Sequence, residues 1–316
     1  MAVDKEIRMI RAGAFLLLTV MLAFPALAQD LPRPKTQKEA DDINACMGEP
    51  DPEMRVDMCE VFLENHPKSA FREHALWMAC TPAPQLPDRS IRYCQKLLVE
   101  FKDTENKEGA LYLTTLGYQQ ANDFEGMLTY GELVLEENPE HWGTLLALAY
   151  VLPIRTRQHD LDKEEKLSQA ESYAKRALDI IPRAENPNPE VITDDDWLLE
   201  KKDLMANAHS SLGAVAAKRE DWAAMEQSYR QALQLANKQT GEVFYHIAKS
   251  LKEQGKNDEA LGMLDQSIAR GGLKLPNGRD AAAILKAEIA LSKAPPAESA
   301  GTAPGAAAQA TPAAQP

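Results

Sequence analysis

Two stretches in the carboxyl-terminal half of the chain decide the fold: residues 212–233 read LGAVAAKREDWAAMEQSYRQAL, and residues 247–268 read IAKSLKEQGKNDEALGMLDQSI. The two stretches have similar residue types at positions that are 35 residues apart, so that Leu212-Gly213 corresponds to Ile247-Ala248 and Tyr229 to Leu264. Apolar residues recur in each at the three- and four-residue spacing typical of amphipathic helices. Each stretch contains two such helices around a polar turn, and the offset therefore predicts a repeated helical hairpin.

The same pattern extends toward the amino terminus in weaker form. From Lys35 to Lys293 the chain is a succession of apolar-periodic segments of roughly 10 to 20 residues, separated by Asn, Asp, Gly and Pro. Partial matches to the hairpin occur at residues 111–139, 140–182 and 63–69. Few stretches alternate as strands do, so we expect an all-α fold.

The repeat resembles the tetratricopeptide repeat (TPR), whose helix A carries large and small apolar residues and whose helix B ends in Ala-Leu. In this reading small residues such as Gly213, Ala248 and Ala260 lie where two helices approach closely, and Tyr229 and Leu264 fill the gaps. The resemblance covers roughly residues 36–293 and is strongest at 206–270. It implies a right-handed superhelical array of about six helix-turn-helix units with a C-terminal capping helix.

The beginning of the chain has the pattern of a cleaved secretory signal at residues 1–28. The pattern consists of a basic start, an apolar core and a small-residue cleavage site, namely Lys5, Arg8 and Arg11, then 14–24, then Ala26-Leu27-Ala28. An uncleaved anchor is the alternative. The mature chain would begin at Gln29, in the periplasm or outside the cell. We expect no lipid anchor, because residue 29 is not Cys, and no membrane span in the mature chain, because no other stretch approaches about 20 apolar residues.

The sequence predicts further divisions along the mature chain. We expect a short leader (29–35), two degenerate N-terminal repeats with disulfides (36–104), central repeats (105–182), a Pro/Asp-rich insertion (183–196), C-terminal repeats with the capping helix (197–293) and a disordered Ala/Pro-rich tail (294–316). The tail has ten Ala and five Pro but one charged residue, and so little bulky apolar surface does not offset the entropy of ordering.

The four cysteines occupy equivalent positions of the first two repeats. Cys46 and Cys80 are 34 residues apart, and Cys59 and Cys94 are 35 apart. An even number in an exported chain suggests disulfides, and the spacing resembles no zinc signature. Because facing helices of one hairpin can bring such residues together, we expect Cys46 to pair with Cys59 and Cys80 with Cys94, although spacing alone leaves the other pairings open.

Charge and motifs narrow the class of function. Removing residues 1–28 leaves 32 basic and 46 acidic residues, a net charge of −14. Lys and Arg are interspersed with the acidic residues, so nucleic acid is not an expected partner.

There is no G-x-S-x-G, Walker, H-E-x-x-H or G-x-G-x-x-G motif, and the six histidines are dispersed. We therefore expect no catalytic residues, no metal site and no cofactor. An enzyme built at the 153–160 and 183–196 insertions, with His159 and Asp194-Asp195-Asp196, is a weaker alternative.

The remaining prediction is a scaffold that binds a protein or peptide in the concave groove lined by helix A residues. Carrying the groove positions of the family onto the best repeats selects Asn207, Ser210 and Ala214 from one, and Glu242, Tyr245 and Lys249 from the next. Of these, Tyr245 and Lys249 are the preferred partner contacts.

A self-associating structural protein is the alternative within the same fold. The helix expected near 279–293 has Ala283, Ile284, Ala287 and Leu291 at helical spacing. Capping the last repeat is predicted to use this same face.

Overall fold

The computed structural model describes residues 32–82 and 85–293, and the predicted signal segment and C-terminal tail lie outside this part of the chain. Within it the regular structure is helical, apart from an isolated bridge between Lys274 and Asp280. The elements are α1 (Gln37–Gly48), α2 (Pro52–Asn65), α3 (Arg72–Cys80), α4 (Pro87–Glu100), α5 (Lys107–Gln120), α6 (Phe124–Glu137), α7 (Trp142–Arg155), α8 (Lys163–Ile180), η2 (Ile181–Arg183), α9 (Asp194–Lys218), α10 (Trp222–Leu235), α11 (Gly241–Glu253), α12 (Asn257–Ala269) and α13 (Ala281–Lys293).

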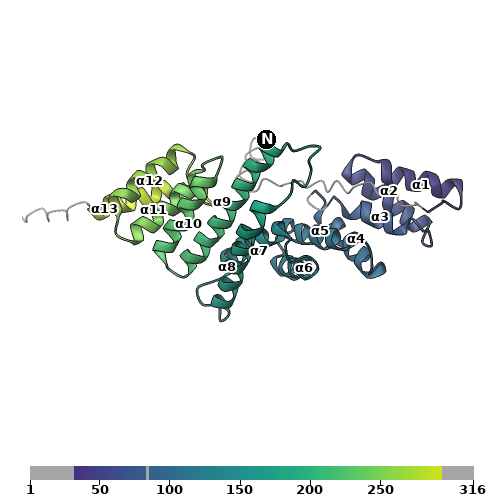
Figure 1. The fold of residues 1–316 in the computed structure, drawn as a ribbon, viewed down its shortest axis with the longest axis horizontal. Helices are drawn as coiled ribbons and strands as arrows, with labels where there is room; N and C mark the ends of the chain where they lie inside the picture. The colour runs from purple at the N-terminus through teal and green to yellow at the C-terminus, as the bar shows by residue number, and fades with distance from the viewer. Residues whose placement is uncertain (1–31, 83–84, 294–316) are drawn as a thin grey trace, which may run out of the picture. The chain divides into compact units, whose positions relative to one another are not determined.

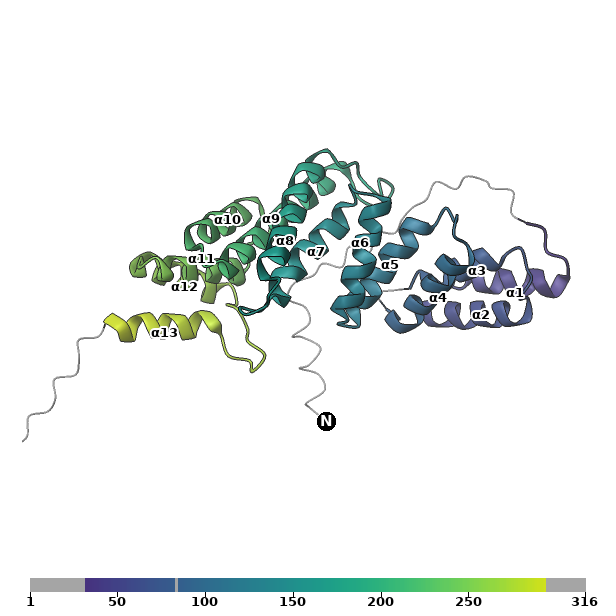
Figure 2. The ribbon, with the colours of Figure 1, turned by 90° about the horizontal axis from the view of Figure 1, so that it is seen from below.

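Consecutive helices pair as antiparallel hairpins, and the chain divides into two compact units between Gln239 and Thr240 (Figures 1 and 2). The first unit contains the hairpins α1/α2, α3/α4, α5/α6, α7/α8 and α9/α10. The second contains α11/α12, against which α13 packs. The described residues thus form six hairpins and one further helix, and the all-α repeat array predicted from the sequence is confirmed.

Polar residues at the helix starts explain why the chain breaks where it does. Asp51 and Asp123 accept hydrogen bonds from backbone N–H groups in the first turns of α2 and α6, which helix geometry leaves unsatisfied. At the opposite ends, Asn122 and Glu220 have φ values of 58° and 60° and end the turns that follow α5 and α9. Short turns of this kind keep each helix B against its own helix A.

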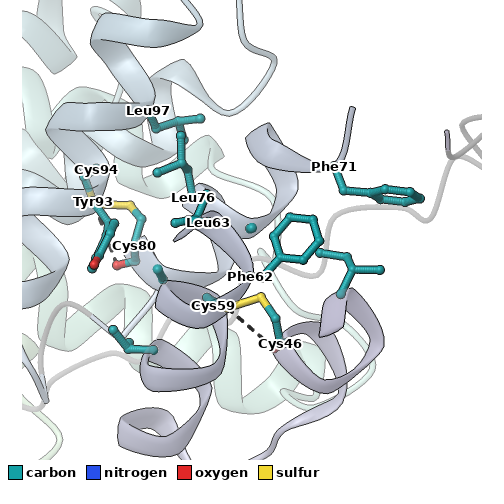
Figure 3. Close-up of a cluster of buried hydrophobic side chains, with 14 of the residues drawn as sticks. Cys46, Cys59, Phe62, Leu63, Phe71, Leu76, Cys80, Tyr93, Cys94 and Leu97 are labelled. Carbon is teal, nitrogen blue, oxygen red and sulfur yellow. Dashed lines mark hydrogen bonds between the residues drawn. A yellow bond between two sulfur atoms is a disulfide. The ribbon is translucent and has the colours of Figure 1, made fainter. Parts of the chain in front are cut away.

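The N-terminal hairpins share one apolar core that contains both disulfides (Figure 3). Cys46 of α1 joins Cys59 of α2, and Cys80 of α3 joins Cys94 of α4, with Cα–Cα distances of 4.6 and 4.8 Å. The predicted pairing is confirmed. All four cysteines are fully buried, beside side chains such as Phe62. The disulfides therefore stabilise the interior of these hairpins.

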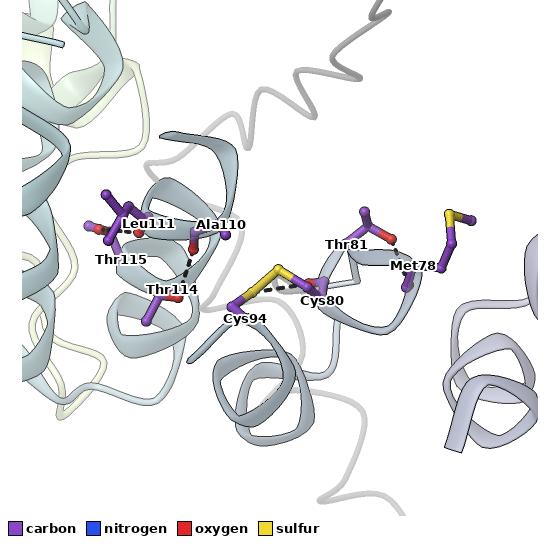
Figure 4. Close-up of a disulfide and its surroundings, with 8 residues drawn as sticks. All are labelled: Met78, Cys80, Thr81, Cys94, Ala110, Leu111, Thr114 and Thr115. Carbon is purple, nitrogen blue, oxygen red and sulfur yellow. Dashed lines mark hydrogen bonds between the residues drawn. A yellow bond between two sulfur atoms is a disulfide. The ribbon is translucent and has the colours of Figure 1, made fainter. Parts of the chain in front are cut away.

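The second disulfide lies close to the first helix of the next hairpin (Figure 4). Thr114 and Thr115 of α5 are buried there, and their hydroxyl groups donate to the carbonyl oxygens of Ala110 and Leu111 at 2.7 and 2.9 Å. Each hydroxyl is satisfied within its own helix, so the surfaces that α5 offers to its neighbours remain effectively apolar.

Helix α9 approaches α10 closely at Gly213. A Cβ atom at this position would lie 2.5 Å from Cε2 of Tyr229, a distance that side chains do not tolerate. Tyr229 is 5% exposed and occupies the space that the missing side chain leaves. The small-residue packing predicted from the repeat is thus present in the α9/α10 hairpin.

Two helices, α7 and α13, have features that the repeat pattern does not show. Pro153 lies inside α7, which continues to Arg155, and its nitrogen has no hydrogen to donate to the carbonyl group four residues earlier. In α13, which packs on α11 and α12, the buried residues include Ala282, Leu285 and Ile289, and Leu291 is 75% exposed. The prediction that capping uses the face of Leu291 was therefore wrong, because the two apolar faces of α13 point in different directions.

Candidate functional site

Helices α7 and α9, each the first helix of its hairpin, lie side by side in the first unit. Their amino-terminal ends meet through Trp142 and Trp197, whose ring centroids are 6.0 Å apart. Near their carboxyl-terminal ends, the Lys218 ammonium group donates to the carbonyl oxygen of Thr156 at 2.6 Å. Helices α7 and α9 are therefore held together at both ends, and together they form one continuous, rigid surface.

Two large apolar residues of α7 remain exposed. Tyr150 is 39% exposed and Ile154 is 52% exposed, one helical turn apart. Most other residues of α7 are buried by the neighbouring helices, which makes the outward side of α7 unusually apolar for a solvent-facing helix. An aromatic ring and a branched side chain at this spacing are suited to anchoring an apolar segment of a partner.

The predicted residues of α9 differ in exposure. Asn207 is exposed, whereas Ser210 and Ala214 are half-buried. The Ser210 hydroxyl group donates to the carbonyl oxygen of Ala206 at 3.0 Å. Ser210 can therefore contribute space and an acceptor lone pair to a contact, and Asn207 can contribute a complete amide. We call Tyr150, Ile154, Asn207, Ser210 and Ala214 together the α7–α9 face.

Tyr245 and Lys249 belong to the second unit, where the structure places them one turn apart on α11, both half-buried. The Tyr245 ring meets the ring of His246 edge-on at 5.3 Å. Burial, with a contribution from the Glu288 carboxylate of α13, raises the pKa of the Tyr245 hydroxyl group. Tyr245 is thus partly enclosed by its own unit and offers less free area than the sequence suggests.

Glu242 completes the predicted set on α11. Its carboxylate lies 3.7 Å from Nε2 of His246, one turn further along the helix. A hydrogen bond from His246 lowers the pKa of Glu242 against the opposing effect of burial. Each predicted group of three therefore forms a stripe on its own helix, α9 in the first unit and α11 in the second.

The insertion residues serve the helix that follows them. Asp194, Asp195 and Asp196 form the first turn of α9, where carboxylates favour the positive end of the helix dipole, and Thr193 caps that turn. Trp197 donates from its indole nitrogen to the carbonyl oxygen of Ala184 at 3.2 Å, which ties the loop to the helix. In the described part of the chain, no group of three or more His, Cys, Asp or Glu residues is arranged to hold a metal ion.

The first unit also has an open cavity of about 520 Å³ where α6, α7 and α8 meet. Its floor includes Leu128, Val151 and Leu152, and its rim includes Arg155, whose guanidinium group stacks on the Phe124 ring. The exposed Ile154 is next in sequence to Arg155, which lines the cavity. Arg155 and Phe124 give the carboxyl-terminal end of α7 a cationic and aromatic border.

Tyr150 and Ile154 were missed from the sequence. The repeat is degenerate around residues 140–160, so no groove position could be carried onto α7. The available signal was the four-residue spacing of two bulky apolar residues. It does not distinguish an exposed face from a buried one in a helix as apolar as WGTLLALAYVLPIR.

No helix in the part of the chain that the structure describes is long and apolar enough to cross a membrane. No family model matches the sequence, and no curated protein matches it.

Solved structures do resemble the chain. A thermophilic TPR protein of Thermus thermophilus is 20% identical, with a TM-score of 0.45 over 67% of this chain and 100% of its own. A tetratricopeptide repeat protein of Parabacteroides merdae is 12% identical, with a TM-score of 0.54 over 81% of this chain and 87% of its own. Together with the six hairpins, the second likeness shows that the chain has the TPR fold.

Proposed function

We propose that this chain is a protein-interaction scaffold of the bacterial cell envelope, and that it binds a protein or peptide partner on the α7–α9 face. The observation that carries the proposal is the exposure of Tyr150 and Ile154 on a helix most of whose other residues are buried. Aromatic and branched apolar residues fixed on rigid helices lose little entropy on binding and dominate interface energies. Asn207 and Ser210 on the neighbouring helix add polar contacts that fix the register of the partner.

Export to the periplasm or the cell exterior is part of this proposal. Two buried disulfides join the only cysteines of the chain, and such bonds persist in oxidising compartments. The signal-like residues 1–28 support the same location. Tyr245 and Lys249 of α11 remain proposed as contacts for a protein or peptide partner, with a smaller contribution because both are half-buried.

The test compares capture of partners from an envelope extract by the wild-type chain and by two matched variants. Tyr150→Ser with Ile154→Ser removes the apolar anchors of α7, and Val61→Ser with Val99→Ser makes the same kind of change on exposed positions of α2 and α4. We expect the first variant to lose a partner that the wild type and the second variant retain. Equal capture by all three would show that the α7–α9 face is not the binding surface. A third variant, Tyr245→Ala with Lys249→Ala, measures the contribution of α11.

Self-association through α13 is a second candidate, and a specific observation favours it. Leu291 is 75% exposed, and Ala283 and Ala287 are exposed beside it, whereas the capping contacts use the other side of the helix. Sedimentation of wild type and Leu291→Ser over a range of concentrations tests this use. A dimer that dissociates in the variant supports it, and a monomer at every concentration refutes it.

A further inference from the structure

His141 precedes α7 and caps its amino-terminal end. The imidazole Nδ1 accepts a hydrogen bond from the backbone N–H of Thr144 at 3.2 Å and lies 2.9 Å from the Thr144 hydroxyl oxygen. A backbone N–H can only donate, so Nδ1 carries no proton and the ring is the neutral tautomer with its hydrogen on Nε2. Unlike the oxygen of a Ser, Thr, Asn or Asp cap, an imidazole nitrogen ordinarily gains its proton close to neutral pH.

The ring is also wedged against the preceding hairpin. Its centroid lies 4.5 Å from that of Tyr112 on α5. Tyr112 also approaches the backbone of α7, since a Cβ on Gly143 would lie 3.2 Å from the Tyr112 hydroxyl oxygen. The imidazole therefore both caps α7 and takes part in its contact with α5.

The groups around the ring do not provide a counter-ion strong enough to favour a proton. Burial lowers the pKa of His141, and the attraction of the Glu108 carboxylate on α5 offsets this effect only in part. Glu108 accepts a hydrogen bond from the Asn138 side-chain amide at 2.8 Å. Tyr112 is neutral, because burial raises its pKa to about 12, and Glu140 is paired with Arg183.

We propose that His141 is an acid-sensitive latch, and that a proton on Nδ1 releases the first turn of α7 from its cap and from α5. Protonation converts the side-chain acceptor of the Thr144 N–H group into a donor, so two donors face each other. It also places a positive charge at the positive end of the α7 dipole. Both effects act on the same turn and in the same direction.

The sign of the pH dependence follows from the direction of the pKa shift. The folded-state pKa of His141 lies below the ordinary value of 6.5. The stabilisation by the neutral cap is therefore fully present above pH 6.5 and is lost as the pH falls from there through the folded-state pKa. Because α7 carries Tyr150 and Ile154, acid would also weaken binding on the α7–α9 face. That last consequence rests on the proposed function, whereas the latch itself does not.

The test is hydrogen exchange by mass spectrometry on the full chain without any partner, at about pH 7.5 and about pH 5, corrected for the intrinsic exchange rate. In the wild type we expect peptides covering residues 138–150 to lose about fivefold in protection at the lower pH, the change that corresponds to loss of a typical N-cap. In His141→Asn, which keeps a cap acceptor but cannot titrate, protection should not change. Unchanged protection in the wild type, or equal loss in His141→Asn, would overturn the proposal.

A matched control separates this latch from the other histidine with the same direction of shift. Burial also lowers the pKa of His209, but this residue lies within α9 and caps no helix. The variant His209→Asn should keep the acid-induced loss at residues 138–150.

An NMR titration of the wild-type imidazole groups provides a readout that does not depend on how His141→Asn folds. A His141 ring that titrates at or above its ordinary pKa contradicts the latch. Since no partner is present in either measurement, failure of the latch is distinguishable from failure of the proposed binding face.

Discussion

Removal of both disulfides should unfold the N-terminal hairpins under native conditions while leaving α11 and α12 folded. The sequence separations are 13 and 14 residues, and a loop of this length stabilises the folded state by about 3 kcal/mol in the chain-entropy model. The two together amount to about 6 kcal/mol, which is comparable to the total stability of a typical domain of about 5–15 kcal/mol. Since α1 to α4 share one core, loss of both bonds should affect all four helices.

The variants are Cys46→Ala with Cys59→Ala, Cys80→Ala with Cys94→Ala, and all four changes combined. Hydrogen exchange with mass spectrometry reports each region separately, which matters because the two compact units need not unfold together. We expect each single-pair variant to lower the free energy of local unfolding of α1–α4 by about 3 kcal/mol. The combined variant should exchange there almost as fast as an unfolded chain.

Wild-type protein that is reduced in urea and refolded with reductant is the control, because it lacks the cross-links but keeps every side-chain volume. It should behave as the combined variant does. Native-like protection of α1–α4 in the combined variant would refute the reasoning, since it would mean that the apolar core of these hairpins suffices by itself.

Three further outcomes follow from the structure. Gly213→Ala should lower the free energy of unfolding by about 1–3 kcal/mol, because its Cβ would lie 2.5 Å from the Tyr229 ring; a denaturant midpoint equal to that of the wild type would contradict this close approach. The Arg72 guanidinium group lowers the pKa of Glu100 below its ordinary value of 4.5, so the stabilisation by this pair is present above about pH 4.5 and disappears as the pH falls further. Glu100→Gln should therefore reduce the loss of thermal stability on acidification, and an unchanged pH profile would argue against the pair. Mass spectrometry of the protein from the envelope fraction should find Gln29 as the first residue, and a chain that still carries residues 1–28 would contradict cleavage there.

The repeat array and the cysteine pairs could be predicted because they depend on local spacing. An offset of 34 or 35 residues sets Cys46 with Cys80 and Cys59 with Cys94 in register, and each disulfide then needs only the two helices of one hairpin. Gly213 opposite Tyr229 follows from the same periodicity.

The proposed binding face could not be predicted in the same way, because exposure depends on which helices pack nearby. Tyr150 and Ile154 read as core residues in an apolar helix, yet the neighbours of α7 leave them uncovered. Likewise, Leu285 and Leu291 are both apolar residues of α13, and only the position of α12 and α11 decides that Leu285 is buried. The sequence does not indicate the capping role of His141, because a histidine that caps a helix has no distinctive sequence pattern.

The disulfide connectivity has a consequence for how the chain matures. Each bond joins cysteines that are consecutive along the chain, Cys46 with Cys59 and Cys80 with Cys94. A polypeptide that enters an oxidising compartment amino terminus first exposes the partners of each bond one after the other, before the next pair arrives. In such a polypeptide the native pairing is also the pairing favoured by order of arrival.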